Sequence, residues 1–223
     1  SDLLTVNEIK KSDLKQYTSS ISTLLNKGVI EEYKEEVYRT NIISNKEDNI
    51  VKLNKEQKNI VEEVSSTDGF TPYLLYGVTG SGKTEVYMHI ISNVIKKGKT
   101  AIVLVPEISL TPQLVDNFHS RFGDNIAILH SRLSNGERYD EWRKIVKGEI
   151  KIVIGARSAI FAPINNLGVI IIDEEHTPTY KQDNNPRYYA HDIALFRAKK
   201  YKIPVLFGSA TPSLEIGRAS CRE

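Results

Sequence analysis

The chain has 223 residues, of which 40% are hydrophobic and 26% are charged, and its formal net charge is +2. This length suits one α/β domain of ordinary size plus a smaller unit, and the weak positive charge does not by itself indicate a nucleic-acid-binding protein. The single cysteine, Cys221, excludes an internal disulfide framework and a cysteine-rich zinc site within these residues, and it favours a reducing, cytoplasmic location.

The sequence shows no targeting or membrane-spanning pattern. No apolar run approaches about 18 residues, and the N-terminus lacks a basic region followed by an apolar one, so we expect a soluble protein without membrane contact. Because the chain opens at Ser1 without a methionine and loses its periodicity after Glu215, we expect a piece of a longer protein. Residues 216–223 are then either an added tail or frayed native sequence.

Residues 1–43 are predicted to form a small N-terminal unit. A short helical piece at Val6–Lys10 and an apolar face that ends at Gly28 indicate two helices. Two short runs of strand-forming residues follow, Val29–Tyr33 and Glu36–Arg39. This order favours part of a winged helix. The alternative is a helix-hairpin adaptor that contacts only protein, because the second helix is not strongly basic. The polar stretch 44–53 is predicted to be a linker.

Residues 54–215 are predicted to form one α/β domain. After a helix at Asn54–Ser65, strands and helices alternate, which indicates a parallel sheet with helices on both faces. The predicted strands are Tyr73–Gly77, Thr100–Val105, Ile126–His130, Lys151–Gly155, Gly168–Asp173 and Pro204–Gly208. The predicted helices between them are Glu85–Lys97, Pro112–Phe122, Asn135–Lys147 and Tyr188–Lys199. In such a sheet the ligand lies beyond the carboxyl ends of the strands.

The strongest motif follows the first strand of this domain. It fits the phosphate-binding pattern G-x-x-x-x-G-K-[ST] between a strand and a helix. Glycines let backbone N–H groups turn towards phosphates at a helix N-terminus, the lysine can reach the β/γ-phosphates, and the last hydroxyl can ligate Mg²⁺. The alternative is a glycine-rich turn with an incidental lysine. We predict a nucleotide site formed by Gly77, Val78, Thr79, Gly80, Ser81, Gly82, Lys83 and Thr84.

Two carboxylates follow another apolar strand. Asp173 and Glu174 come directly after the run Val169–Ile172. A P-loop enzyme needs a carboxylate to hold Mg²⁺ and often a second one to polarise the attacking water. We therefore predict Lys83, Asp173 and Glu174 as catalytic residues, with Asp173 and Thr84 as Mg²⁺ ligands. The alternative for the two carboxylates is a solvated acidic turn.

Three further strings make a resemblance specific. They are Asp-Glu-Glu-His at 173–176, Gly-Ser-Ala-Thr-Pro-Ser at 208–213 and Val-Pro-Glu-Ile-Ser-Leu-Thr at 105–111. With the phosphate loop they resemble the first, RecA-like motor lobe of a superfamily 2 helicase, and more narrowly the bacterial primosomal replication-restart helicases. The resemblance covers nearly all of residues 9–215. The family's usual Gly-Thr-Arg-Ser is Gly-Ala-Arg-Ser here, so Ala156 lacks a hydroxyl that could contact phosphate.

The resemblance assigns further residues to the ATP site. Gln57 matches the glutamine that reads the adenine edge, and by itself would be a surface helix residue. Ser209 and Thr211 match the motif that couples hydrolysis to movement, and by themselves would be a strand-end turn. His176 is then expected to relay between the carboxylates and that motif. It does not qualify as a metal ligand, since no second histidine or cysteine stands at ligand spacing.

For DNA, the resemblance points to loops rather than to a basic face. Arg157 and Ser158 match the family's backbone-contact motif, and an arginine that caps a strand end is the alternative. An aromatic and basic run after the acidic motif matches the loop that links single-strand binding to ATP turnover. Aromatic faces can stack on unpaired bases while cations neutralise phosphate. The candidates in this run are Tyr180, Lys181, Arg187 and Tyr188, although one of Tyr188 and Tyr189 is expected in the core.

The resemblance implies an ATP-dependent 3′-to-5′ DNA helicase that uses Mg²⁺ and restarts replication. It implies action on forked or single-stranded DNA, with primosome and helicase-loading proteins and the single-stranded DNA-binding protein as partners. We expect a cytoplasmic monomer. The family's second motor lobe and zinc-containing insertion are expected outside this chain, which alone should be nearly inactive. The alternatives are a double-strand DNA translocase that does not unwind, and a winged-helix scaffold regulated by ATP.

Overall fold

The computed structural model describes residues 9, 11–33, 51–78 and 80–212 of the chain. The chain divides into two compact units, residues 1–37 and 38–223, and each is described by itself. The domain boundaries predicted from the sequence, including the linker at 44–53, stay predictions.

The first unit contains a helical segment. The 3₁₀ helix η2 (Lys11–Tyr17) leads directly into α1 (Thr18–Asn26). The helix ends where the sequence predicts, because Gly28 adopts a φ of +65°, a left-handed conformation that glycine accepts without strain.

The hairpin predicted to follow α1 is not confirmed. Val29–Tyr33 is irregular chain rather than a strand, and the predicted partner Glu36–Arg39 lies outside the described residues. Val29 and Tyr33 are 65% and 62% exposed, so these apolar side chains do not bury the face that a strand of this pattern would need. Most of the helical piece predicted at Val6–Lys10 also lies outside the described residues. The winged helix therefore remains unconfirmed.

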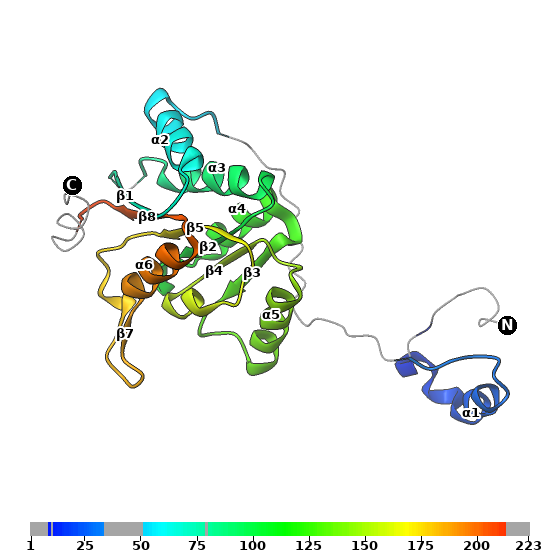
Figure 1. The fold of residues 1–223 in the computed structure, drawn as a ribbon. Coiled ribbons are helices and arrows are strands. Elements are labelled where there is room, and N and C mark those ends of the chain that lie inside the picture. Colours follow the sequence, from blue (N-terminus) through cyan, green and yellow to red (C-terminus); the bar gives the residue numbers. More distant parts are fainter. Residues whose placement is uncertain (1–8, 10, 34–50, 79, 213–223) are drawn as a thin grey trace. The chain divides into compact units, whose positions relative to one another are not determined.

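The second unit is built on one sheet of six parallel strands (Figure 1). In sheet order they are β1 (Thr71–Tyr76), β8 (Pro204–Ser209), β5 (Leu167–Ile172), β2 (Thr100–Leu104), β4 (Ile152–Gly155) and β3 (Ile126–Leu129). All six predicted strands are present, each within two residues of its predicted ends. The central strands are buried along their whole length, as expected when both faces of a parallel sheet are covered.

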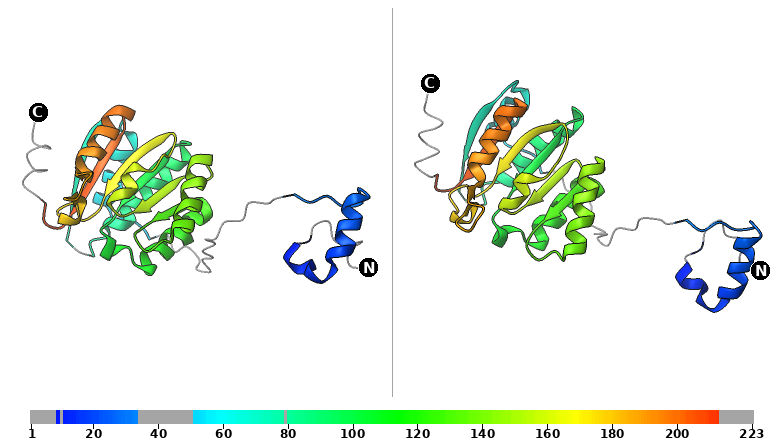
Figure 2. Two further views of the ribbon diagram at one scale, coloured as in Figure 1. Left: turned by 90° about the horizontal axis from the view of Figure 1, so that it is seen from below. Right: turned by 60° about the horizontal axis from the view of Figure 1, so that its bottom comes forward.

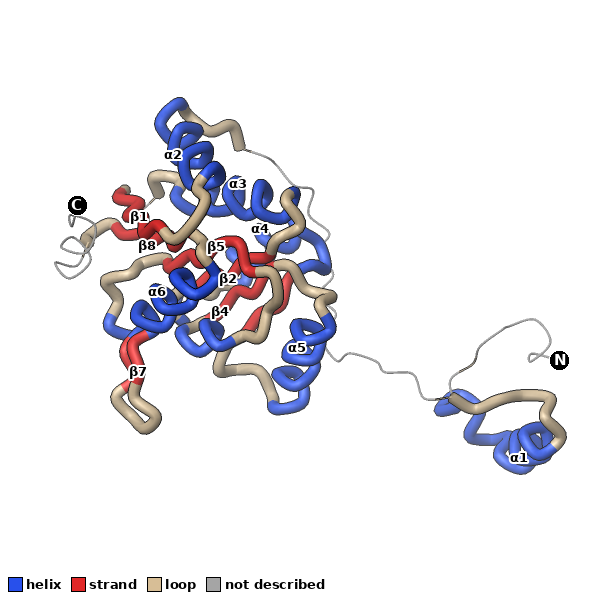
Figure 3. The backbone as a smooth tube through the Cα atoms, viewed as in Figure 1, coloured by secondary structure: helices blue, strands red, loops and turns tan. Residues whose placement is uncertain are grey.

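Helices cover both faces of the sheet, as the colouring by secondary structure shows (Figure 3). Side chains alternate along each strand, so Val103 and Ile171 join the core under one helix layer while Ile102 and Ile170 join the core under the other. The first layer consists of α2 (Lys55–Ser66), α3 (Lys83–Lys96) and α4 (Pro112–Phe122), and the second of α5 (Asn135–Lys147) and α6 (Ala190–Tyr201). Figure 2 shows the sheet between these layers from two further sides. The predicted α/β class is confirmed.

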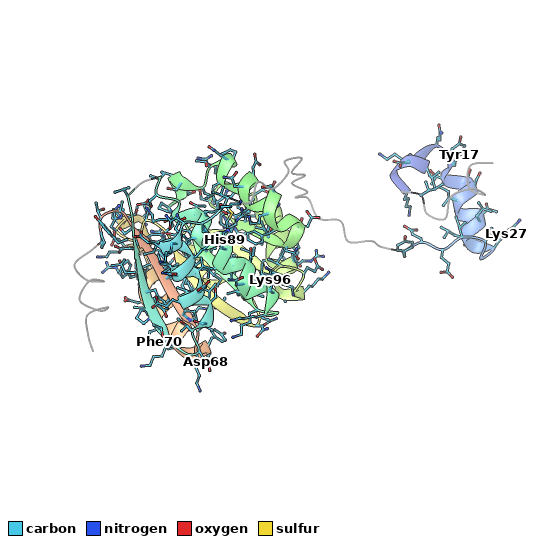
Figure 4. All side chains as sticks on the ribbon, turned by 90° about the horizontal axis from the view of Figure 1, so that it is seen from above. Tyr17, Lys27, Asp68, Phe70, His89 and Lys96 are labelled. Atoms are coloured by element: carbon cyan, nitrogen blue, oxygen red, sulfur yellow. The ribbon has the colours of Figure 1, made fainter. Side chains whose placement is uncertain are left out.

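A partly buried ion pair joins two helices of the first layer. Arg121 Nη1 of α4 lies 2.6 Å from Glu85 Oε1 of α3, and His89 Nε2 lies 3.3 Å from the same oxygen. Figure 4 labels His89 on this layer. No helix in the described part of the chain is long and apolar enough to cross a membrane.

A small hairpin and several short helices were not predicted. Strand β6 (Lys181–Gln182) pairs antiparallel with β7 (Tyr188–Tyr189), so α6 begins at Ala190 rather than at the predicted Tyr188. The short helices are η3 (Glu107–Ser109), η4 (Gly123–Asn125), η5 (Arg157–Phe161) and η6 (Pro178–Tyr180).

A histidine in the first turn of α6 is buried among aromatic rings. His191 is 2% exposed and stacks on Tyr189 and Phe207, with centroid distances of 4.2 and 5.3 Å, while Tyr180 meets it edge-on. Its Nε2 lies 3.8 Å from Oε2 of the buried Glu175. Burial lowers the pKa of His191 to about 4, so this side chain is neutral at neutral pH.

We predict that His191→Phe removes a pH-dependent part of the stability. The pKa of His191 is about 4 in the folded chain against 6.5 when unfolded, so the unfolded chain binds more protons between these values and the wild type loses stability as the pH falls through that range. The loss is on the order of 3 kcal/mol. Urea unfolding of both proteins between about pH 7 and about pH 4 measures it. Identical pH dependence in wild type and variant would contradict the prediction.

Candidate active site

The loop between β1 and α3 has the backbone geometry of a phosphate cradle. Gly80 and Gly82 have φ values of +80° and +84°, which only glycine adopts readily. A Cβ at Gly82 would lie 2.8 Å from Nε2 of Gln57, and one at Gly77 would lie 2.7 Å from Oγ of Ser81. The backbone conformation thus favours glycine at positions 80 and 82, and a side chain at position 77 or 82 would also displace Ser81 or Gln57. Thr79 lies outside the described residues.

Lys83 is the first residue of α3, and its side chain folds back over this loop. It is 9% exposed, and its Nζ donates to the carbonyl oxygens of Gly77 at 2.6 Å and Val78 at 3.3 Å. Thr84 follows it and is half-buried. A helix N-terminus concentrates unpaired backbone N–H groups and partial positive charge, so the buried ammonium and the end of α3 together favour an anion at this place.

Gln57 packs against the loop from α2. Its backbone N–H donates to Asn54 Oδ1 at 2.8 Å, its Oε1 accepts from the Asn54 N–H at 3.0 Å, and its Nε2 donates to the carbonyl of Ser81 at 3.1 Å. This capping box fixes the start of α2. It also brings the side-chain amide to the phosphate loop, and the role of Gln57 in reading the adenine edge stays a prediction.

Asp173 directly follows β5 and contacts a tyrosine of α3. Tyr87 Oη donates to Asp173 Oδ1 at 2.8 Å. Burial raises the pKa of the Asp173 carboxyl, and this hydrogen bond opposes the rise. Burial, together with the charge on Asp173, raises the pKa of Tyr87 well above its ordinary value, so Tyr87 remains a donor. The sequence analysis missed Tyr87, which fits the apolar face of α3; the glycine at 208 is the one signal that could have pointed to it.

His176 connects the acidic motif with the turn after β8. Its Nδ1 lies 2.8 Å from Oγ of the fully buried Ser209, and its Nε2 lies 3.7 Å from Glu174 Oε2. The N–H of Thr211 donates to the same Ser209 Oγ at 3.1 Å. The structure therefore brings together the three residues that the resemblance assigns to coupling, and places a carboxylate beside them.

Arg157 is held by backbone rather than left open to solvent. It begins η5, and its Nη1 donates to the carbonyl oxygens of Lys181 at 2.6 Å and Thr179 at 3.3 Å. A guanidinium carries five N–H donors, so these bonds leave others for a phosphate. Ser158 next to it is exposed.

The β6–β7 hairpin carries the remaining candidates for DNA contact. Lys181 is exposed, with its Nζ 5.1 Å from the ring centroid of Tyr189, and Arg187 is exposed with its Nε bonded to the carbonyl of Asp183. Tyr188 is half-buried and packs edge-on against Phe161, with the centroids 4.9 Å apart. Tyr188 and Tyr189 are both partly buried and pack against the core, so neither is the fully buried member that the sequence analysis expected.

The prediction that Tyr180 stacks on bases is wrong. Its ring is 1% exposed and lies in the core between the sheet and α6. Its hydroxyl donates to the backbone carbonyl of Asp173 at 2.6 Å. Tyr180 therefore holds the backbone of the acidic motif from within the core, where a nucleic acid cannot reach its ring.

The donors at this edge of the sheet fit Mg²⁺ carried by a nucleotide. In the described residues no three His, Cys, Asp or Glu side chains cluster in a way that would hold a metal ion by themselves. Mg²⁺ in nucleotide enzymes is held by one or two protein oxygens together with phosphates and water. One carboxylate from Asp173 and one hydroxyl from Thr84 match that requirement.

The comparisons identify the class of protein. Residues 54–218 match the model of the DEAD/DEAH box helicase family, and the chain belongs to this family. More particularly, it is 53% identical over 92% of its length to the replication restart protein PriA of Bacillus subtilis, and 52% identical over 73% to that of Synechocystis. It spans 26% and 20% of the lengths of those relatives.

A solved structure supports the fold assignment. RecG bound to a three-way DNA junction is 25% identical to this chain and superposes with a TM-score of 0.55, covering 76% of this chain and 22% of that one. The resemblance to the replication-restart helicases and the RecA-like α/β fold are thus confirmed.

Proposed function

We propose that this chain is the ATP-binding motor lobe of an ATP-dependent 3′-to-5′ DNA helicase that restarts replication at stalled forks. The observation that carries the proposal is the meeting of three motifs at one edge of the sheet: the buried Lys83, the carboxylates of Asp173 and Glu174, and the His176–Ser209 hydrogen bond. Identity of 53% to a replication restart protein supports the biological role, and the polarity is proposed from the resemblance to the family alone.

The residues of the site have distinct roles in this proposal. Lys83 leaves the carbonyls of Gly77 and Val78 and binds the β- and γ-phosphates, which cluster at the N-terminus of α3. Thr84 and Asp173 would hold Mg²⁺, which would supply positive charge to neutralise the phosphates. Glu174 orients the attacking water, and Gln57 reads the adenine edge.

Coupling and DNA contact are assigned to neighbouring elements. His176 transmits the state of Glu174 to Ser209 and Thr211, through the contacts described above. Arg157 and Ser158 bind DNA phosphates, and the hairpin residues Lys181, Arg187 and Tyr188 bind single-stranded DNA. The proposed partners are primosome and helicase-loading proteins and the single-stranded DNA-binding protein, with the protein acting as a cytoplasmic monomer.

The chain alone is proposed to hydrolyse ATP slowly. In two-lobed motors the second lobe supplies an arginine that stabilises charge in the transition state, and such an arginine contributes a factor on the order of 10³ to 10⁵ in rate. Zinc is proposed only for the part of the full-length protein that lies outside this chain.

The first test uses the full-length protein with Lys83→Ala and Glu174→Gln. Both variants should lose fork unwinding and at least about 100-fold of the DNA-stimulated ATPase rate, because one loses a phosphate contact and the other loses the group that orients water. Lys96→Ala, an exposed lysine on the same helix, is the control and should retain both activities. If the wild-type full-length protein hydrolyses ATP and moves along DNA but does not unwind forks, the result would favour a translocase. Unwinding that survives Lys83→Ala would favour a scaffold.

The second test concerns the hairpin. The double variant Lys181→Ala/Arg187→Ala of the full-length protein should bind single-stranded DNA about 10-fold more weakly, with a smaller dependence of affinity on salt, because two phosphate contacts are removed. Lys199→Ala/Lys200→Ala removes the same charge from the exposed end of α6 and should change neither quantity. If both double variants weaken DNA binding equally, the effect comes from the overall charge of the protein. The hairpin would then not be a DNA-binding element.

A further inference from the structure

Tyr87 lies one turn into α3, on the side of the helix that faces the acidic motif. Its ring is 2% exposed, and its hydroxyl forms the 2.8 Å hydrogen bond to Asp173 Oδ1. Residues three and four positions apart share one face of a helix, so Tyr87 lies on the same face as Lys83 and Thr84. One rigid element therefore carries the lysine for phosphate, the hydroxyl for Mg²⁺ and a direct contact to the carboxylate across from them.

Three hydrogen bonds from three elements fix Asp173. Its backbone N–H donates to the carbonyl of Leu104 at 2.9 Å, and its carbonyl accepts from the Tyr180 hydroxyl at 2.6 Å. These two bonds hold the backbone. The bond from Tyr87 acts on the carboxylate itself, which also accepts from the backbone of Glu174, and it ties the direction of the carboxylate oxygens to α3.

Gly208 makes room for this contact. Strand β8 pairs with β5, and a Cβ at Gly208 would lie 1.7 Å from Oη of Tyr87, 2.9 Å from its Cζ and 3.2 Å from Asp173 Oδ1. Cβ atoms essentially never approach other atoms within 3.0 Å. The glycine before Ser209 is thus required by space, since its backbone conformation is open to any residue.

We propose that Tyr87 is a positioning residue that orients the Asp173 carboxylate towards the Mg²⁺ of a bound nucleotide, and that Gly208 is glycine in order to admit its hydroxyl. The inference rests on the proposed ATP site. A carboxylate has about four acceptor positions, so the bonds from Tyr87 and from the backbone of Glu174 leave room for a metal. Groups that orient a metal ligand in this way typically contribute 10- to 100-fold to metal affinity.

The test compares nucleotide binding with and without metal in the full 223-residue chain. Fluorescent ADP is titrated in EDTA and then at increasing MgCl₂, for wild type and Tyr87→Phe. The variant keeps the buried ring and loses only the hydroxyl. Its affinity in EDTA should stay within about 2-fold of wild type, while the Mg²⁺ concentration that gives half of the affinity gain should rise about 10-fold or more.

Tyr73→Phe is the matched control. Tyr73 Oη shares a 2.6 Å hydrogen bond with Thr67 Oγ1 at the other end of the first helix layer, so this variant also loses one tyrosine hydroxyl with a partner. It should lower the melting temperature to a similar extent without changing the Mg²⁺ dependence. A purely structural role for Tyr87 predicts that the two variants behave alike, and that result would overturn the inference.

A second variant reaches the same contact from β8. Gly208→Ala retains Tyr87 and displaces its hydroxyl, and should raise the Mg²⁺ requirement as Tyr87→Phe does. In the double variant the 1.7 Å clash with the hydroxyl is absent and, of the two close contacts with the side chain at position 87, only the 2.9 Å contact with the ring carbon Cζ remains, so its Mg²⁺ requirement should be no higher than that of Gly208→Ala alone. Additive effects would overturn the inference. Wild-type Mg²⁺ dependence in Tyr87→Phe would overturn it alone, whereas a wild type that binds no nucleotide would overturn the proposed function as well.

Discussion

The position of β8 between β1 and β5 is the constraint on which the whole site depends. Because the three strands are parallel and adjacent, their carboxyl ends open at one edge of the sheet. Two backbone hydrogen bonds continue the pairing beyond the strands: the N–H of Gly77 donates to the carbonyl of Ser209 at 3.1 Å, and that of Glu175 donates to the carbonyl of Gly208 at 3.0 Å. The phosphate loop and the acidic motif are thus both hydrogen-bonded to the last two residues of β8.

The β6–β7 hairpin is attached to this edge by side chains that are themselves buried or hydrogen-bonded. The Tyr180 hydroxyl bonds to the backbone of Asp173, and the Arg157 guanidinium bonds to the carbonyl of Lys181, where the hairpin begins. A ligand that displaced the hairpin would have to shift these contacts, and with them the backbone beside the nucleotide site. For the DNA site proposed on the hairpin and the ATP site proposed on the loop, these contacts form a physical path by which each ligand would influence the binding of the other.

The sequence predicted the parts of this structure that depend on local pattern. The alternation of apolar and polar residues predicted all six strands, and the spacing of glycines and lysine predicted the loop between β1 and α3. Each of these patterns is formed by residues that lie close together in the sequence. Tyr180 was misassigned and Tyr87 was missed because their roles depend on burial and on a hydrogen bond to Asp173. Asp173 lies 7 positions from Tyr180 and 86 positions from Tyr87 in the sequence. Val29–Tyr33 does not form a strand, and its apolar side chains Val29 and Tyr33 are exposed rather than packed on a core. The β6–β7 hairpin, of two residues a side, is too short for alternation to reveal.

The proposed site depends on the buried ammonium of Lys83, which lies where it can bind phosphates at the start of α3. A crystal structure of the chain with Mg²⁺ and a non-hydrolysable ATP analogue tests this directly. We expect the phosphates at the N-terminus of α3, with Lys83 Nζ bonded to the β- and γ-phosphates instead of the carbonyls of Gly77 and Val78. We also expect the Asp173 carboxylate to face the Mg²⁺ ion. Nucleotide bound elsewhere, or Lys83 still bonded to both carbonyls beside a bound nucleotide, would contradict it.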